Sequence, residues 1–119
     1  MKFISRLIGM YENVRIGDPL DPKTLMGPLI DEGAVADYEN AIKAAREQGG
    51  EVLYGGKVLR ARFGRRTFVK PTIIAINNDA EIVQSETFAP ILYVMKYRNL
   101  KQAIALHNNV PQGLSSGIF

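Results

Sequence analysis

Apolar residues recur at the spacing of an α-helix in three segments of this 119-residue chain. Residues 3–14 and residues 100–108 each present one apolar stripe, and Asn99 is suited to cap the second of these helices. A longer helix is predicted to begin after Asp31, a favourable N-cap residue, and to end at Gly49–Gly50. The side chains predicted to share its buried face are Val35, Tyr38, Ile42 and Ala45.

Shorter apolar runs predict strands at residues 51–54, 68–76, 91–97 and 114–119. Pro71 has no N–H to donate, so we expect an edge or a break inside the second run. The third run is almost continuously apolar, which is typical of a strand covered on both faces. Helices that alternate with such strands indicate the α/β class, with mostly parallel strands and flanking helices in a partial three-layer sheet.

The chain has no cysteine and a single histidine, His107. Within these residues, those counts exclude disulfides, thiolate metal sites, cysteine nucleophiles and sites with several histidines. His107 is interpreted as a packing or surface residue. No apolar run approaches the roughly 18–20 residues that a membrane span requires, and the N-terminus lacks the pattern of a signal peptide. We therefore expect a cytoplasmic protein with no membrane partner.

The net charge of +3 is concentrated between Lys57 and Lys70, where six positive residues occur and no acidic ones. Such a segment can attract phosphate or nucleic acid. Alternatively, it is a solvated connection between two strands. We favour the second interpretation because only Phe63 and Phe68 interleave with the charges, and nucleic-acid binding needs aromatic residues for base stacking.

Four ordered segments resemble the aldehyde dehydrogenase superfamily, and the resemblance runs over nearly the whole chain. They read V-R-I-G-D-P at residues 14–19, M-G-P-L-I at 26–30, S-E-T-F-A-P-I at 85–91 and N-N-V-P-Q-G-L-S-S-G-I-F at 108–119. The T-F-A-P form is similar to the branch that contains aminoadipate-semialdehyde dehydrogenase (antiquitin). The chain stops inside an apolar run, which leads us to expect a truncated sheet.

This resemblance implies a cysteine nucleophile, a glutamate base and NAD or NADP as the hydride acceptor. The first two motifs precede the region matched here, as does most of the nucleotide-binding domain. Residues 1–119 are accordingly expected to form a partial catalytic domain that lacks the nucleophile segment and the nucleotide-binding domain. On its own, the chain is predicted to be inactive and to have no catalytic residues.

Glu86 and Phe88 match the family's E-x-F-x-P loop, in which the carboxylate accepts hydrogen bonds from the nicotinamide ribose and the ring packs beside it. Ser85 and Ala89 stand where the family more often has Glu and Gly. The alternative interpretation is that Glu86 is an exposed turn carboxylate and Phe88 a core residue that anchors Pro90. For the isolated chain the alternative is favoured, and no bound cofactor is expected.

Three functional hypotheses remain open from the sequence. The chain is a remnant of an NAD(P)-dependent aldehyde dehydrogenase, a subunit that complements a second dehydrogenase chain, or an interaction module. The third class includes a homo-oligomer and a nucleic-acid binder that uses its basic segment. If the chain folds alone, we expect it to self-associate, because an unfinished sheet leaves edges to cover. The sequence identifies neither the aldehyde nor the choice between NAD and NADP.

Overall fold

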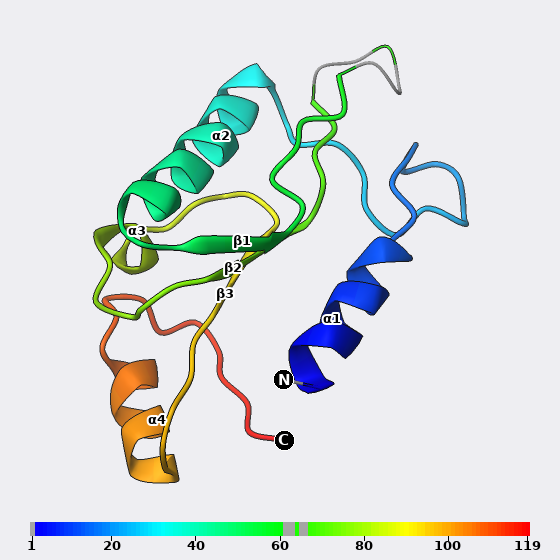
Figure 1. The fold of residues 1–119 in the computed structure, drawn as a ribbon. Helices are drawn as coiled ribbons and strands as arrows, with labels where there is room; N and C mark the ends of the chain where they lie inside the picture. Colours follow the sequence, from blue (N-terminus) through cyan, green and yellow to red (C-terminus); the bar gives the residue numbers. More distant parts are fainter. Residues whose placement is uncertain (1, 61–63, 65–66) are drawn as a thin grey trace.

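The structure is a computed structural model that describes residues 2–60, 64 and 67–119 (Figure 1). The helices are α1 (Lys2–Glu12), α2 (Glu32–Glu47), α3 (Glu81–Gln84) and α4 (Leu100–Asn108). The strands are β1 (Glu51–Tyr54), β2 (Thr72–Ala75) and β3 (Ile91–Val94). The α/β class predicted from the sequence is confirmed for these residues.

The three strands form a small mixed sheet in the order β1-β2-β3. β1 runs antiparallel to β2, and β2 runs parallel to β3 with Ile74 opposite Tyr93. The sequence predicted mostly parallel pairing, which holds for only one of these two strand pairs. β1 and β2 pair antiparallel across the connection that includes Lys57–Lys70, whereas the path from β2 to β3 passes through α3 and the loop after it.

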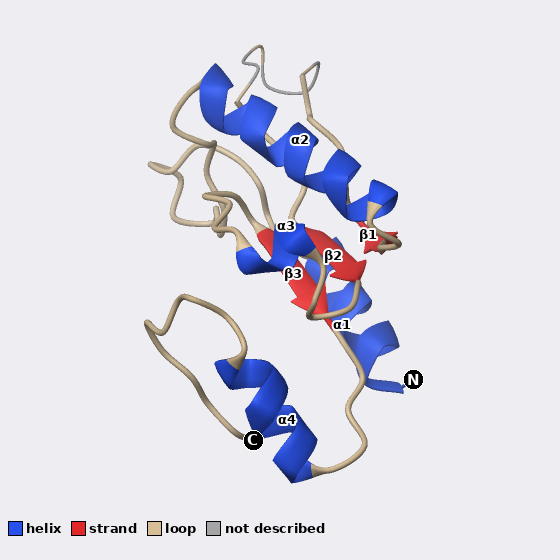
Figure 2. Cartoon of the chain, turned by 90° about the vertical axis from the view of Figure 1, so that its left-hand side faces the viewer, coloured by secondary structure: helices blue, strands red, loops and turns tan. Residues whose placement is uncertain are grey.

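Helix α2 provides the core on one face of the sheet (Figures 1 and 2). The carboxylate of Asp31 accepts a hydrogen bond from the Ala34 amide at 2.8 Å, which is the predicted N-cap. The face predicted to be buried is buried in full, and it packs on Ile74 and its neighbours. These helix residues are Val35, Tyr38, Ile42 and Ala45.

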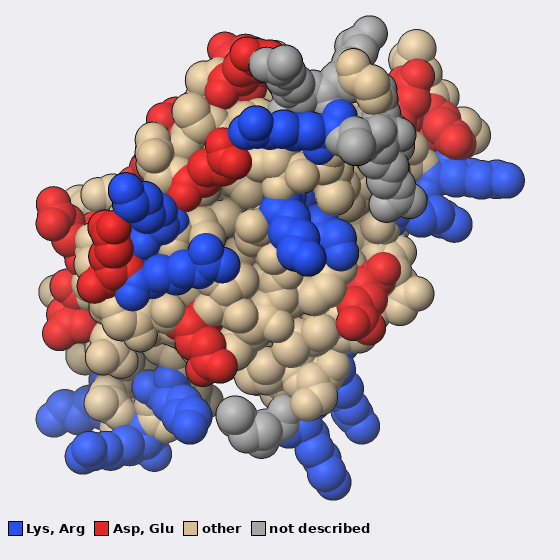
Figure 3. Space-filling view, turned by 45° about the horizontal axis from the view of Figure 1, so that its top comes forward, with Lys and Arg blue, Asp and Glu red and all other residues tan. Residues whose placement is uncertain are grey.

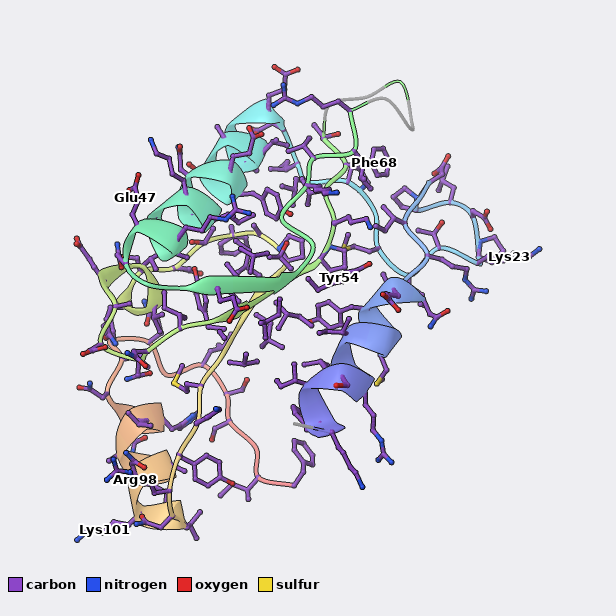
Figure 4. The ribbon with its side chains drawn as sticks, viewed as in Figure 1. Lys23, Glu47, Tyr54, Phe68, Arg98 and Lys101 are labelled. Atoms are coloured by element: carbon purple, nitrogen blue, oxygen red, sulfur yellow. The ribbon has the colours of Figure 1, made fainter. Side chains whose placement is uncertain are left out.

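Helix α1 lies on the opposite side of the sheet from α2 (Figures 1 and 2). Its Tyr11 ring meets the ring of Tyr54 edge to face, with centroids 6.2 Å apart. Tyr54 is labelled in Figure 4. A register irregularity between Val52 and Tyr54 places Tyr54 opposite Ile73, which, unlike Ile74, is not part of the core cluster that contains the α2 residues. Helix α4 extends from one end, which contributes to extents of 46 × 27 × 25 Å.

Several sequence predictions were wrong in detail. Residues 114–119 form no strand and are exposed, and no backbone hydrogen bond joins them to another described segment. β3 ends at Val94, and Leu92 is 38% exposed, so the strand is not covered on both faces. Pro71 does interrupt the 68–76 run, as expected, and leaves β2 as its second half. The helix α3 was not predicted at all.

Candidate functional site

The loop that follows α3 is positioned from two sides. At its beginning, the Ile82 amide donates to the side-chain oxygen of Gln48 at 2.9 Å, which attaches α3 to the end of α2. At its end, the Thr72 amide of β2 donates to the Pro90 carbonyl at 2.9 Å. Between these ties the Ala89 amide donates to the Thr87 carbonyl at 2.8 Å. The segment 85–90 is therefore supported by the core helix and the central strand.

Exposure alternates along this loop. Glu86 and Phe88 are both exposed, Phe88 by 85%, whereas Thr87 between them is partly buried. The structure therefore contradicts the interpretation of Phe88 as a core residue, although Glu86 does carry an exposed carboxylate. The Phe88 ring therefore lies outside the core and is accessible for contact with a ligand or a partner.

Between the loop and helix α2 lies an open cavity of about 350 Å³, and both Glu86 and Phe88 line it. The helix contributes Asp37 and Asn40 on one of its turns, together with the small side chains of Ala41 and Ala44. The structure thus brings the two predicted site residues to one surface. The complete lining is Asp37, Asn40, Ala41, Ala44, Ile82, Ser85, Glu86, Thr87 and Phe88.

The polar groups of this cavity are carboxylates, an amide and hydroxyls, and its lining includes no lysine or arginine. Carboxylates accept hydrogen bonds from sugar hydroxyls and repel phosphate. An exposed aromatic ring beside them offers a flat apolar surface. The arrangement therefore suits a diol attached to a flat ring, and it is unsuited to a pyrophosphate.

Asp37 and Asn40 were not singled out from the sequence. They are three residues apart on α2, next to the buried Tyr38 and Ala41, and therefore border the apolar face of the helix. Nothing in the helical pattern connected that edge to a loop more than forty residues later. Only the tertiary contact between α2 and α3 brings them together.

The other candidate residues lie elsewhere. His107 is exposed and borders a larger cavity of about 490 Å³ between α4, the end of β3 and the C-terminal segment, far along the chain from Glu86. Its lining is mainly apolar, with Met95, Leu106 and Val110 among its members. Among the described residues, no cluster of three or more His, Cys, Asp or Glu side chains could hold a metal ion.

The basic segment is only partly described. Arg60 pairs with Glu39 of α2 at 3.2 Å, and the Lys70 ammonium lies 5.3 Å from the centre of the Tyr54 ring. Phe63, Arg62, Arg65 and Arg66 lie outside the described residues, so the nucleic-acid hypothesis is not tested by the structure. On the face shown in Figure 3, acidic and basic side chains are interspersed over α2. No described helix is long and apolar enough to cross a membrane.

Comparison with known proteins gives one family. The model of the "Aldehyde dehydrogenase family" matches residues 1–119. The chain is 49% identical over 116 residues to a pea (Pisum sativum) protein named aldehyde dehydrogenase family 7 member A1, covering 98% of this chain and 22% of that protein. It is 46% identical over 117 residues to bovine (Bos taurus) alpha-aminoadipic semialdehyde dehydrogenase, covering 98% of this chain and 21% of the relative. The branch predicted from the T-F-A-P loop is confirmed.

Solved structures agree with these relatives. An aldehyde dehydrogenase mutant from Bacillus cereus superimposes with a TM-score of 0.89 at 28% identity, covering 99% of this chain and 24% of the other. Betaine aldehyde dehydrogenase from Staphylococcus aureus, solved in complex with NAD+, gives a TM-score of 0.85 at 28% identity, covering 92% of this chain and 22% of the other. The chain therefore spans about a fifth of the length of the curated relatives it matches.

Proposed function

This chain belongs to the aldehyde dehydrogenase family, and we propose that it contributes the loop that holds the nicotinamide ribose of NAD or NADP. The single observation that carries this proposal is the cavity between α2 and residues 85–88, lined by both Glu86 and Phe88. Its chemistry fits the ribose end of the dinucleotide. The cofactor, when bound, supplies the acceptor for the hydride of an aldehyde oxidation.

In this proposal Glu86 accepts hydrogen bonds from the two ribose hydroxyls. A carboxylate can accept from both hydroxyls of a diol, and such charge-assisted bonds are short and directional. Phe88 packs its exposed ring beside the ribose and limits where the attached ring can move. Asp37 on the facing wall adds negative charge, which disfavours phosphate and favours the ribose end.

The same 119 residues contain no cysteine, so the attack on an aldehyde that a thiolate performs cannot come from them. We therefore propose that the chain alone does not oxidise aldehydes. Neither the aldehyde nor the preference between NAD and NADP follows from the cavity, because its lining contacts neither an aldehyde nor the 2′-position of the adenosine ribose in this proposal.

An amide NMR titration of the labelled chain with NAD tests the cofactor proposal. We expect shifts confined to residues 85–88 and to the facing turn of α2. Adenosine diphosphate ribose, which keeps the ribose but lacks the nicotinamide, is expected to shift the same amides by a smaller amount, because Phe88 then contacts the ribose alone. Dispersed signals that respond to neither compound would overturn the proposal. A parallel assay of NADH formation with the pure chain is expected to give none.

A second candidate function is complementation of another dehydrogenase chain. The observation that favours it is the unfinished surface: β3 is an edge strand and Leu92 on it is 38% exposed. In this reading, a chain that carries the nucleophile and the nucleotide-binding domain covers that edge. Aldehyde-dependent NADH formation that appears only when the two chains are mixed would support it, and failure of the chains to co-purify would count against it.

A further inference from the structure

Tyr93 carries a buried polar atom without a hydrogen bond. Its hydroxyl oxygen is inaccessible to solvent and, among the described residues, it is the one buried side-chain nitrogen or oxygen that lacks a partner. The residue lies in β3 opposite Ile74, on the sheet face that α2 covers, and its ring packs against the hydrophobic core. A core position alone calls for an apolar ring, so the hydroxyl requires a separate explanation.

The hydroxyl lies close to the loop that bears Glu86 and Phe88. Burial raises the pKa of Tyr93 above 10.0, and the Thr87 side chain acts in the opposite direction by stabilising the phenolate. The two hydroxyls are therefore neighbours, although their geometry in this structure falls short of a hydrogen bond. Thr87 is partly buried, whereas its two neighbours Glu86 and Phe88 are exposed.

The backbone leaves this part of the loop incompletely fixed. The Thr87 carbonyl accepts from the Ala89 amide within the loop, and the hydrogen bond to the sheet comes only later, where the Pro90 carbonyl accepts from the Thr72 amide. Because Glu86 and Phe88 flank Thr87 directly, the orientation of both depends on where it lies.

We propose that Tyr93 is a positioning residue for the Glu86–Phe88 loop and acts through the hydroxyl of Thr87. An unpaired buried hydroxyl is costly, so a small movement of Thr87 toward Tyr93 is favoured and holds the two exposed side chains in one arrangement. The purpose of that arrangement, which is to hold the cofactor, rests on the proposed function. The coupling itself concerns only residues of this chain and can fail or succeed separately.

Amide hydrogen exchange on three variants of the full chain tests the coupling. Tyr93→Phe and Thr87→Val each remove one hydroxyl and keep the shape of the side chain. Each is expected to accelerate exchange of the Ala89 amide by roughly three- to tenfold, and the double variant by no more than either single one. Tyr54→Phe is the matched control, since its hydroxyl donates to Tyr11 on the opposite side of the sheet at 3.4 Å.

A titration of the tyrosine ring carbons distinguishes positioning from simple packing. In Thr87→Val the midpoint for Tyr93 is expected to move to still higher pH, because the group that stabilises its phenolate is gone. Unchanged Ala89 exchange in both single variants, additive effects in the double variant, or an unmoved Tyr93 titration would overturn the proposal. If NAD fails to shift residues 85–88 while these effects appear, only the cofactor proposal fails.

Discussion

The phenolic oxygen of Tyr38 on α2 lies 2.8 Å from the hydroxyl oxygen of Thr72 on β2, and both side chains are fully buried. Tyr38 also donates to the Lys70 carbonyl at 2.8 Å, and Thr72 accepts from the Gly56 amide at 2.9 Å. One pair of hydroxyls thus joins the core helix, the central strand and the turn after β1. Every polar atom named here has a partner, which is the condition under which a buried network stabilises a fold.

Tyr38→Phe is expected to lower the free energy of unfolding by about 1–2 kcal/mol, because it removes hydrogen bonds at a buried position and leaves the Lys70 carbonyl with fewer partners. Urea denaturation followed by circular dichroism measures the change. Tyr97→Phe is the control and is expected to change nothing, since Tyr97 is 63% exposed. Equal stability of the two variants would mean that the network does not stabilise this fold.

The stability of the chain is expected to fall at alkaline pH. Burial raises the pKa of both Tyr38 and Tyr93 above 10.0, so the folded state retains protons that the unfolded state has lost. The stability that these two protonated hydroxyls contribute is fully present below pH 10, and it is lost as the pH rises through the higher pKa values of the folded state. Urea midpoints at several values between about pH 8 and 11 measure the slope. The double variant Tyr38→Phe, Tyr93→Phe is expected to show a shallower decline, and an identical slope would refute the assignment.

Gly55→Ala is expected to destabilise the chain by about 2–4 kcal/mol. Gly55 has φ +81°, and a Cβ there would collide with the Pro71 carbonyl and the Thr72 hydroxyl. Gly49→Ala is a matched control, because its φ of +86° is similar but no atom lies within 4 Å of the added Cβ. It is expected to cost about 1 kcal/mol from backbone strain alone. Equal costs at the two positions would mean that the close approach of β2 to this turn is unimportant.

The parts of the fold that could be predicted are those that local physics determines. The cap at Asp31 and the stripe through Tyr38 depend on residues within one helix, and the sequence predicts both. The direction of β1 and the coil at residues 114–119 depend on which segments lie beside them, which no local pattern contains. Helix α3 has four residues, too few for a periodic signal.

The candidate site also has a part that the sequence predicts and a part that only the tertiary structure shows. Glu86 and Phe88 were identified from a short motif, and the structure brings both to one cavity. Asp37 and Asn40 reach that cavity only because Gln48 holds α3 against the end of α2. The hydroxyl of Tyr93 could not be distinguished from that of any other strand tyrosine, because only the tertiary structure shows that it is buried without a partner.

Glu86→Gln is expected to raise the NAD concentration that half-saturates the amide shifts of residues 85–88 by about tenfold or more, since a neutral amide replaces a charge-assisted acceptor. Phe88→Ala is expected to remove the contribution that the Phe88 ring makes to the NAD-induced shifts. Both residues are exposed, so neither change should alter the urea midpoint. Glu81→Gln, an exposed carboxylate at the start of α3 outside the cavity lining, is the control. Equal effects of the three substitutions would show that NAD does not use this cavity.

The exposed apolar surface predicts association at high protein concentration. Phe3 and Met10 on α1 are 72% and 70% exposed, and Leu92 on the edge strand β3 is 38% exposed. Burying such surface against a second copy or a complementing chain is favourable, and edge strands pair readily. Sedimentation velocity across a concentration series is expected to show a shift from monomer to dimer. Leu92→Lys places a charge on the edge strand and is expected to suppress that shift, whereas Lys96→Ala, beyond the strand end, should not. A clean monomer at the highest concentration would mean that the edge is protected within this chain, and it would remove the main physical argument for complementation.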